Sequence, residues 1–150
     1  MVTINAGQAL GTTSDVQFKS LGVGTAASGT TGEIRATNNI TAYYSDERLK
    51  TRLGPITDPL YKVSKLSGFY YQANEVAQAL GYEVKKEVGI SAQEVYQVQP
   101  EVVAPAPIDS KYLTVRYERL VPLLIEAIKE LKTEVDLLRK QINELTNGNS

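Results

Sequence analysis

The sequence predicts an α+β protein built from three consecutive parts, and changes in composition and periodicity define them. Residues 1–44 are rich in glycine, threonine, alanine and serine and carry little charge. Residues 45–117 contain aromatic, charged and proline residues in short alternating helix and strand patterns, and residues 118–150 carry a regular heptad. We therefore expect a short β-rich segment, a compact α+β domain and a long coiled-coil helix, intertwined with copies of the same chain.

Composition narrows the possible chemistry. The chain has 150 residues and a formal net charge of -1, which gives no global electrostatic case for binding nucleic acid or an anionic membrane. No stretch has the ~18 consecutive apolar residues of a membrane span. Histidine and cysteine are both absent, which excludes a Ser-His-Asp triad, a disulfide and the usual zinc ligands. We expect no metal, no cofactor, no nucleic acid and no membrane partner.

The N-terminal segment has strand-like pieces that glycines interrupt. Alternation predicts short strands at 2–4 and 16–18, and a strand pair at 33–36 and 40–43 with a turn at 38–39. So few apolar side chains cannot enclose a core within one chain. A flexible linker would share this composition. We favour the end of a longer intertwined β-fibre whose strands pack against other subunits.

The middle of the chain alternates between helix and strand at short intervals. Ser45 is a good N-cap for a first helix, and Ser91 is a good N-cap for a later one. Pro100, Pro105 and Pro107 predict an extended crossing. The predicted helices cover 45–50, 58–66, 74–81 and 91–98, and the predicted strands cover 69–72, 88–90 and 112–117.

The C-terminal helix, predicted over 118–146, carries apolar residues spaced alternately by four and three positions. Pro122 is tolerable because it lies in the first turn, and Glu134 and Arg139 fall at g and e positions where an interchain pair can form. β-Branched residues at a with leucine at d favour a two-stranded coiled coil, but an attached domain can impose another number of helices. The predicted oligomerisation seam is Leu124, Ile128, Leu131, Val135, Leu138, Ile142 and Leu145.

A serine and a lysine five residues apart stand at the boundary between the first two parts. A lysine can activate the Ser45 hydroxyl only as a neutral amine, whereas a free lysine titrates near pH ~10.4. Burial among the aromatic residues that follow, or a neighbouring cation, would favour the neutral form of Lys50. Asp46 would either cap the helix or orient Lys50. By itself, this spacing is far more typical of a helix cap and a solvated lysine than of a catalytic pair.

The surrounding block is more specific. Ser45-Asp46-Glu47-Arg48-Leu49-Lys50 resembles the opening S-D-x-R-x-K signature of the peptidase S74 family, the intramolecular chaperone domains of phage tail spikes and fibres such as endosialidases. One departure is Gly54-Pro55-Ile56, where many members have a charged residue before isoleucine. The later blocks that resemble the family are 66–71, 88–95, 100–103, 112–113 and 120–131.

The resemblance implies a homotrimeric chaperone that folds the preceding fibre and then cuts itself off. The scissile bond would be Tyr44–Ser45, with Ser45 as nucleophile and Lys50 as general base. The protein would be made in the host cytoplasm, the fibre would remain in the virion tail, and the chaperone would be released. Alternatives are a trimerisation or receptor-attachment tip that does not cut, and a serine protease that acts in trans. Related domains of membrane-tethered transcription factors fit less well, because no membrane span or basic DNA-binding region is present.

Overall fold

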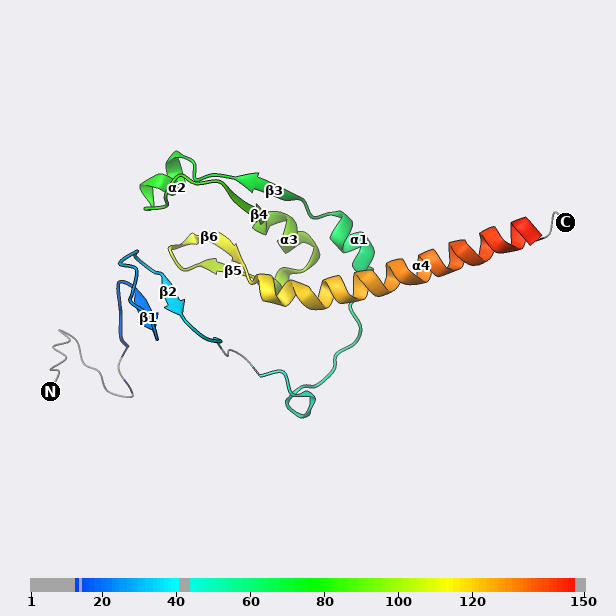
Figure 1. Ribbon diagram of the computed structural model, residues 1–150, viewed down its shortest axis with the longest axis horizontal. Helices are drawn as coiled ribbons and strands as arrows, with labels where there is room; N and C mark the ends of the chain where they lie inside the picture. Colours follow the sequence, from blue (N-terminus) through cyan, green and yellow to red (C-terminus); the bar gives the residue numbers. More distant parts are fainter. Residues whose placement is uncertain (1–12, 14, 41–43, 148–150) are drawn as a thin grey trace. The chain divides into compact units, whose positions relative to one another are not determined.

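The computed structural model of the chain describes residues 13, 15–40 and 44–147. Contacts divide the chain into two compact units, Met1–Arg52 and Leu53–Ser150. The described residues form short helices, one long helix and small two-stranded sheets, so the predicted α+β class is confirmed (Figure 1). The predicted domain boundaries at 44/45 and 117/118 stay predictions, as do the trimer and the coiled coil.

The first unit contains a small parallel sheet. Strand β1 (Leu21–Val23) pairs with β2 (Ile34–Ala36), and Leu21 lies opposite Ile34. The strand predicted at 33–36 is confirmed, but its partner is β1, which the glycine-broken pattern did not predict. The expected partner at 40–43 lies mostly outside the described residues, as does the strand expected at 2–4. The strand expected at 16–18 is wrong, since these residues are not in strand conformation.

This sheet encloses no core. Val23 is 54% exposed and Ile34 63%, and no described residue of the first unit is buried. The turn after β1 requires Gly24, which has a φ of 71° and lies so close to the Thr37 hydroxyl that a Cβ would clash. Short exposed strands of this kind are marginal alone, because little apolar surface offsets the entropy of ordering them.

The second unit follows the predicted order closely. A short 3-10 turn η1 (Glu47–Leu49) belongs to the first unit, and the remaining elements lie in the second. They are α1 (Pro59–Ser64), β3 (Gly68–Tyr71), α2 (Glu75–Ala79), β4 (Glu87–Ile90), α3 (Ala92–Val98), η2 (Pro100–Val102), β5 (Val103–Ala106), β6 (Asp109–Val115), η3 (Tyr117–Leu120) and α4 (Val121–Asn147). Antiparallel pairs β3–β4 and β5–β6 form its sheets.

Side-chain caps place the short helices where the sequence indicated. The Ser91 hydroxyl accepts a hydrogen bond from the Glu94 backbone N–H at 3.3 Å, and Asn74 caps α2 in the same way. The extended crossing expected after α3 is only partly correct. Pro100 opens the turn η2, and Pro105 lies inside β5, whose pairing with β6 is interrupted by an irregularity after Pro105.

The core of the second unit lies where α3, η2, η3 and the start of α4 meet. Its fully buried members are Val95 and Leu123, which are 0% and 1% exposed. Burying a leucine or valine side chain contributes about 1.5–3 kcal/mol. The rest of the cluster consists of buried Val102 and Leu120, surrounded by Ile56, Val63, Leu66, Ile90, Val103 and Val115.

Two carboxylates on helices of this unit accept hydrogen bonds from the backbone of neighbouring segments. Glu130 of α4 accepts a hydrogen bond from the Leu60 backbone N–H at 2.9 Å, at the start of α1. Glu94 of α3 accepts one from the Ser67 N–H at 2.8 Å, just before β3. Asp58, the N-cap residue of α1, makes no side-chain cap bond, so Glu130 satisfies one N–H of that helix from a distant element.

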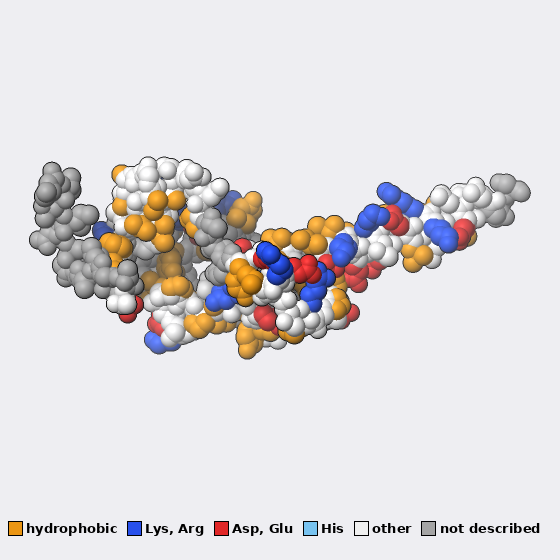
Figure 2. Space-filling model, turned by 90° about the horizontal axis from the view of Figure 1, so that it is seen from below, with side chains coloured by type: hydrophobic (Ala, Val, Ile, Leu, Met, Phe, Trp, Pro, Cys, Tyr) orange, Lys and Arg blue, Asp and Glu red, His pale blue; other side chains and the backbone are white. Residues whose placement is uncertain are grey.

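Helix α4 confirms the predicted long C-terminal helix, with Pro122 in its first turn. The C-terminal part of the helix projects past the other elements of its unit (Figure 1). Hydrophobic side chains remain at the surface along it, beside clusters of charged side chains (Figure 2). No helix in the described part of the chain is long and apolar enough to cross a membrane.

Candidate self-cleavage site

A tight turn brings the predicted serine and lysine together. The Leu49 N–H bonds to the Asp46 carbonyl at 3.2 Å and the Lys50 N–H to the Glu47 carbonyl at 3.0 Å, which closes η1. The chain is extended again at Lys50, and its side chain returns toward Ser45. The Lys50 Nζ donates a hydrogen bond to the Ser45 Oγ at 3.1 Å. A neutral amine at this distance could accept the hydroxyl proton along the same line.

Asp46, not Ser45, caps this turn. Its Oδ1 accepts a hydrogen bond from the Arg48 backbone N–H at 2.9 Å. The expected Ser45 cap is therefore wrong, since the next residue is an equally good capping type and occupies the N-cap position. Because Asp46 takes this role, the Ser45 hydroxyl is left for Lys50.

The Asp46 carboxylate also holds the Arg48 guanidinium. The Arg48 Nη2 lies 2.7 Å from Oδ2, and its Nε lies 3.0 Å from Oδ1. Hydrogen bonds from the Arg48 side chain and then from its backbone lower the pKa of Asp46, and the nearby Lys50 charge adds a smaller effect in the same direction. The sequence left two roles open for Asp46, and its contacts are those of a cap.

Arg48 is the residue that reasoning from the sequence missed. It was visible as the arginine of the S-D-x-R-x-K block, but the block alone does not show what the guanidinium contacts. A second pair on the same stretch joins Arg52 to Glu47 at 2.7 Å.

The site is open to solvent within this chain. Ser45 and Lys50 are both exposed, and Tyr44 is 67% exposed. The predicted burial of Lys50 among the aromatic side chains of the second unit stays a prediction.

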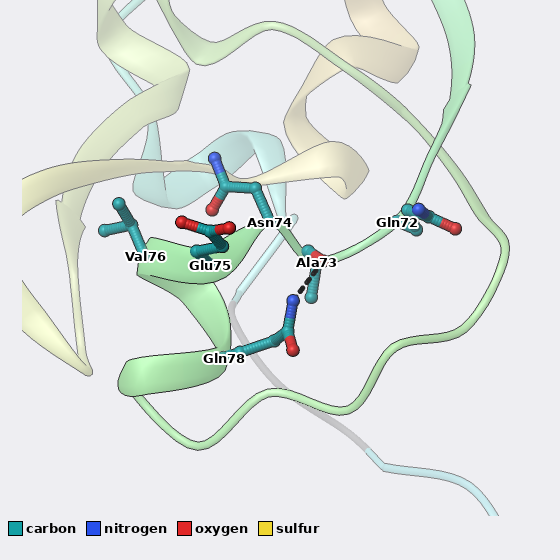
Figure 3. Close-up of a pocket in the computed structure, with 6 residues that line it drawn as sticks. All are labelled: Gln72, Ala73, Asn74, Glu75, Val76 and Gln78. Atoms are coloured by element: carbon teal, nitrogen blue, oxygen red, sulfur yellow. Dashed lines mark hydrogen bonds between the residues drawn. The ribbon is translucent and has the colours of Figure 1, made fainter.

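The other features of the described chain offer less chemistry. No group of acidic side chains there could hold a metal ion. A shallow pocket of about 500 Å³ lies around α2, lined by Gln72, Ala73, Asn74, Glu75, Val76 and Gln78. In Figure 3, Gln78 reaches back to the Ala73 carbonyl, to which its amide donates a hydrogen bond. The pocket lining contains one carboxylate and neither a serine nor a lysine, so it lacks a nucleophile–base pair.

The predicted oligomerisation seam is a second candidate site. All seven of its side chains are large and apolar, and all are exposed, from 36% at Val135 to 70% at Leu145. Charged pairs within the helix, such as Lys129 with Glu126, lie outside the seam. The described chain thus leaves much of this side of α4 exposed to solvent.

Comparison with known proteins decides the family of the central segment. Residues 45–104 match the family model described as the chaperone of endosialidase. This segment is a chaperone-of-endosialidase domain. The resemblance deduced from the sequence is confirmed for these residues, and Ser45 is the first residue of the match. The likeness of the later blocks, from 112 onward, stays a prediction.

Most of the chain is similar to phage fibre proteins. The chain is 37% identical over 119 residues to the long tail fiber protein Gp37 of Enterobacteria phage K3, and equally similar to that of Enterobacteria phage T2. These matches cover 74% of this chain but only 9% of each fibre protein. The chain therefore corresponds to a small part of the proteins it resembles.

Proposed function

We propose that the domain is an intramolecular chaperone that trimerises a phage tail fibre, guides its folding and then releases itself by cutting the Tyr44–Ser45 bond. The observation that carries the proposal is the 3.1 Å contact between the Lys50 amine and the Ser45 hydroxyl. It falls at the first residue of the chaperone-of-endosialidase match. Similarity to long tail fibre proteins supports a fibre as the folding client.

The cut would proceed by an acyl shift. Neutral Lys50 takes the Ser45 hydroxyl proton, and the oxygen attacks the carbonyl carbon of Tyr44, the preceding residue. The C–N bond breaks, the Ser45 amine takes up a proton, and an ester links Tyr44 to the serine oxygen. Water then hydrolyses the ester, which leaves a Tyr44 carboxylate and restores the serine hydroxyl. Each chain cuts once, in cis.

Assembly would complete the site. The dyad is exposed in one chain, whereas a lysine base requires surroundings that favour its neutral form. Neighbouring chains in a trimer can exclude water and strain the Tyr44–Ser45 peptide, so cleavage would follow assembly.

The chaperone role has its own physical reason. The described strands of the first unit, β1 and β2, are three residues long, largely exposed and separated by glycine-containing segments, so a wrong register between chains costs little locally. Joining the chains through α4 first aligns them and raises the effective concentration of their strands. Cleavage afterwards removes the guide, and the fibre is then kinetically trapped in its folded state. The fibre would stay in the virion tail while the chaperone is released.

Denaturing intact-mass measurement of purified protein tests the cut. The wild type is expected to give fragments that meet between Tyr44 and Ser45, and Ser45→Ala one full-length mass, because alanine has no nucleophilic oxygen. Ser28→Ala, an exposed serine of the first unit, serves as the control and should cut normally. An intact wild type would contradict self-cleavage.

The exposure of the dyad favours one second candidate, a trimerisation or attachment tip that keeps the fold but does not cut. In that case Lys50 is a solvated lysine, and wild type and Ser45→Ala both remain full length as trimers.

A further inference from the structure

On the turn that carries Ser45 and Lys50, each carboxylate is paired with an arginine side chain. Both oxygens of Asp46 are engaged by Arg48, through Nη2 at 2.7 Å and Nε at 3.0 Å. Glu47 is paired with Arg52 at 2.7 Å. Within residues 45–52, which are all described, each carboxylate thus has an arginine, and Lys50 contacts a hydroxyl instead.

We propose that Arg48 is a positioning residue for self-cleavage, which holds the Asp46 carboxylate on the turn and so keeps it from pairing with Lys50. The inference rests on the proposed function, because it assigns a role in that reaction. It adds a residue that contacts neither the nucleophile nor the base and acts through Asp46.

The chemistry of the base explains why such a residue is needed. A lysine amine four residues from a carboxylate tends to pair with it, and an ion pair stabilises the protonated ammonium. A protonated lysine cannot accept the Ser45 proton. Asp46 lies four residues before Lys50 on the same short turn, and the Lys50 charge helps to lower the pKa of that carboxylate.

Arginine suits this task better than lysine. Its guanidinium stays charged at every pH at which the base could work, and its fork matches both carboxylate oxygens. The pair is largely solvent-exposed, since the Arg48 side chain is 88% and the Asp46 side chain 40% exposed. Exposed ion pairs contribute little to stability, so we infer that the main effect of this pair is on the position of the Asp46 charge and not on the stability of the fold.

The test is the pH dependence of the cleavage rate. Uncut chain is isolated under denaturing conditions and refolded by dilution into buffers from weakly acidic to alkaline, and denaturing mass follows the cut. The charged groups on the stretch that carries Lys50 are Asp46, Glu47, Arg48 and Arg52, and only the first and third are changed. The variants are Arg48→Gln, the double variant Asp46→Asn/Arg48→Gln, and Arg35→Gln as an exposed arginine outside the turn.

We expect Arg48→Gln to move the pH midpoint of cleavage upward by about one unit, which is about a tenfold loss of rate below the midpoint. The released carboxylate then favours the protonated lysine. The double variant should return the midpoint to the wild-type value, because asparagine keeps a capping oxygen but carries no charge. Arg35→Gln should match the wild type.

Other outcomes overturn the proposal. A purely structural role for Arg48 would lower the rate equally at every pH, leave the midpoint unchanged and make the double variant no better than the single one. If Arg48→Gln misfolds, the double variant still tests the proposal, since a midpoint shifted from the wild-type value refutes it. A wild type and Arg35→Gln that stay uncut at every pH would instead show that the proposed function itself has failed.

Discussion

Replacing Lys50 by alanine is expected to abolish cleavage while the chain still folds and assembles. The Lys50 side chain is exposed and its contact is the 3.1 Å bond to Ser45, so no core packing is lost. A positioned general base is worth about 10²–10⁴ in rate, so we expect a loss of at least about a hundredfold. The fraction of full-length mass after refolding, followed over time, measures it.

Lys50→Arg distinguishes the role of Lys50 as a base from the role of its positive charge. Arginine keeps the positive charge and the length but does not lose its proton, so this variant should be as inactive as alanine. Lys19→Ala, an exposed lysine elsewhere in the first unit, should cut at the wild-type rate. Normal cleavage in Lys50→Ala or Lys50→Arg would remove the lysine from the mechanism.

Replacing Leu138 by glutamate is expected to dissociate the proposed trimer. Leu138 lies on the seam and is 56% exposed in the single chain, so the change leaves the fold of one chain intact. Each buried leucine contributes about 1.5–3 kcal/mol, and every chain of the trimer would lose this and bury a charge. We expect assembly to weaken by more than about a hundredfold. Native mass should show single chains, and cleavage should slow with assembly.

Leu137 gives a matched control. It is the same residue type, the next position along α4 and also 56% exposed, but it lies outside the seam. Leu137→Glu should therefore assemble and cut like the wild type. Equal disruption by both variants would show that the helix does not associate through this seam.

Local signals allowed the second unit to be predicted almost element by element. Ser91 and Asn74 are capping residues whose side chains bond the expected N–H groups, and the α4 pattern alone gave a long helix. The partner of β2 could not be predicted, because strand pairing between distant segments depends on the fold and leaves no local mark in glycine-broken strands. Strand β5 was not predicted either, because it contains Pro105 and proline is unusual inside a paired strand.

The candidate site, too, could be predicted from the sequence only in part. The nearness of Ser45 and Lys50 follows from a tight turn of a few residues, which the family block identified. The choice of Asp46 as cap could not be foreseen, since serine and aspartate cap helices about equally well. The pairing of Arg48 with Asp46 became visible only with the turn in three dimensions. In the proposed trimer, other chains supply the surroundings that favour a neutral lysine, and the sequence of one chain does not show how they assemble.

Native mass of the fragment released after refolding tests the central claim most directly. A self-cleaving trimeric chaperone predicts an assembly of three copies of residues 45–150, with the cut between Tyr44 and Ser45 in every copy. An assembly of three full-length chains would contradict the cleavage, and a single chain cut at that bond would contradict the dependence of cleavage on assembly.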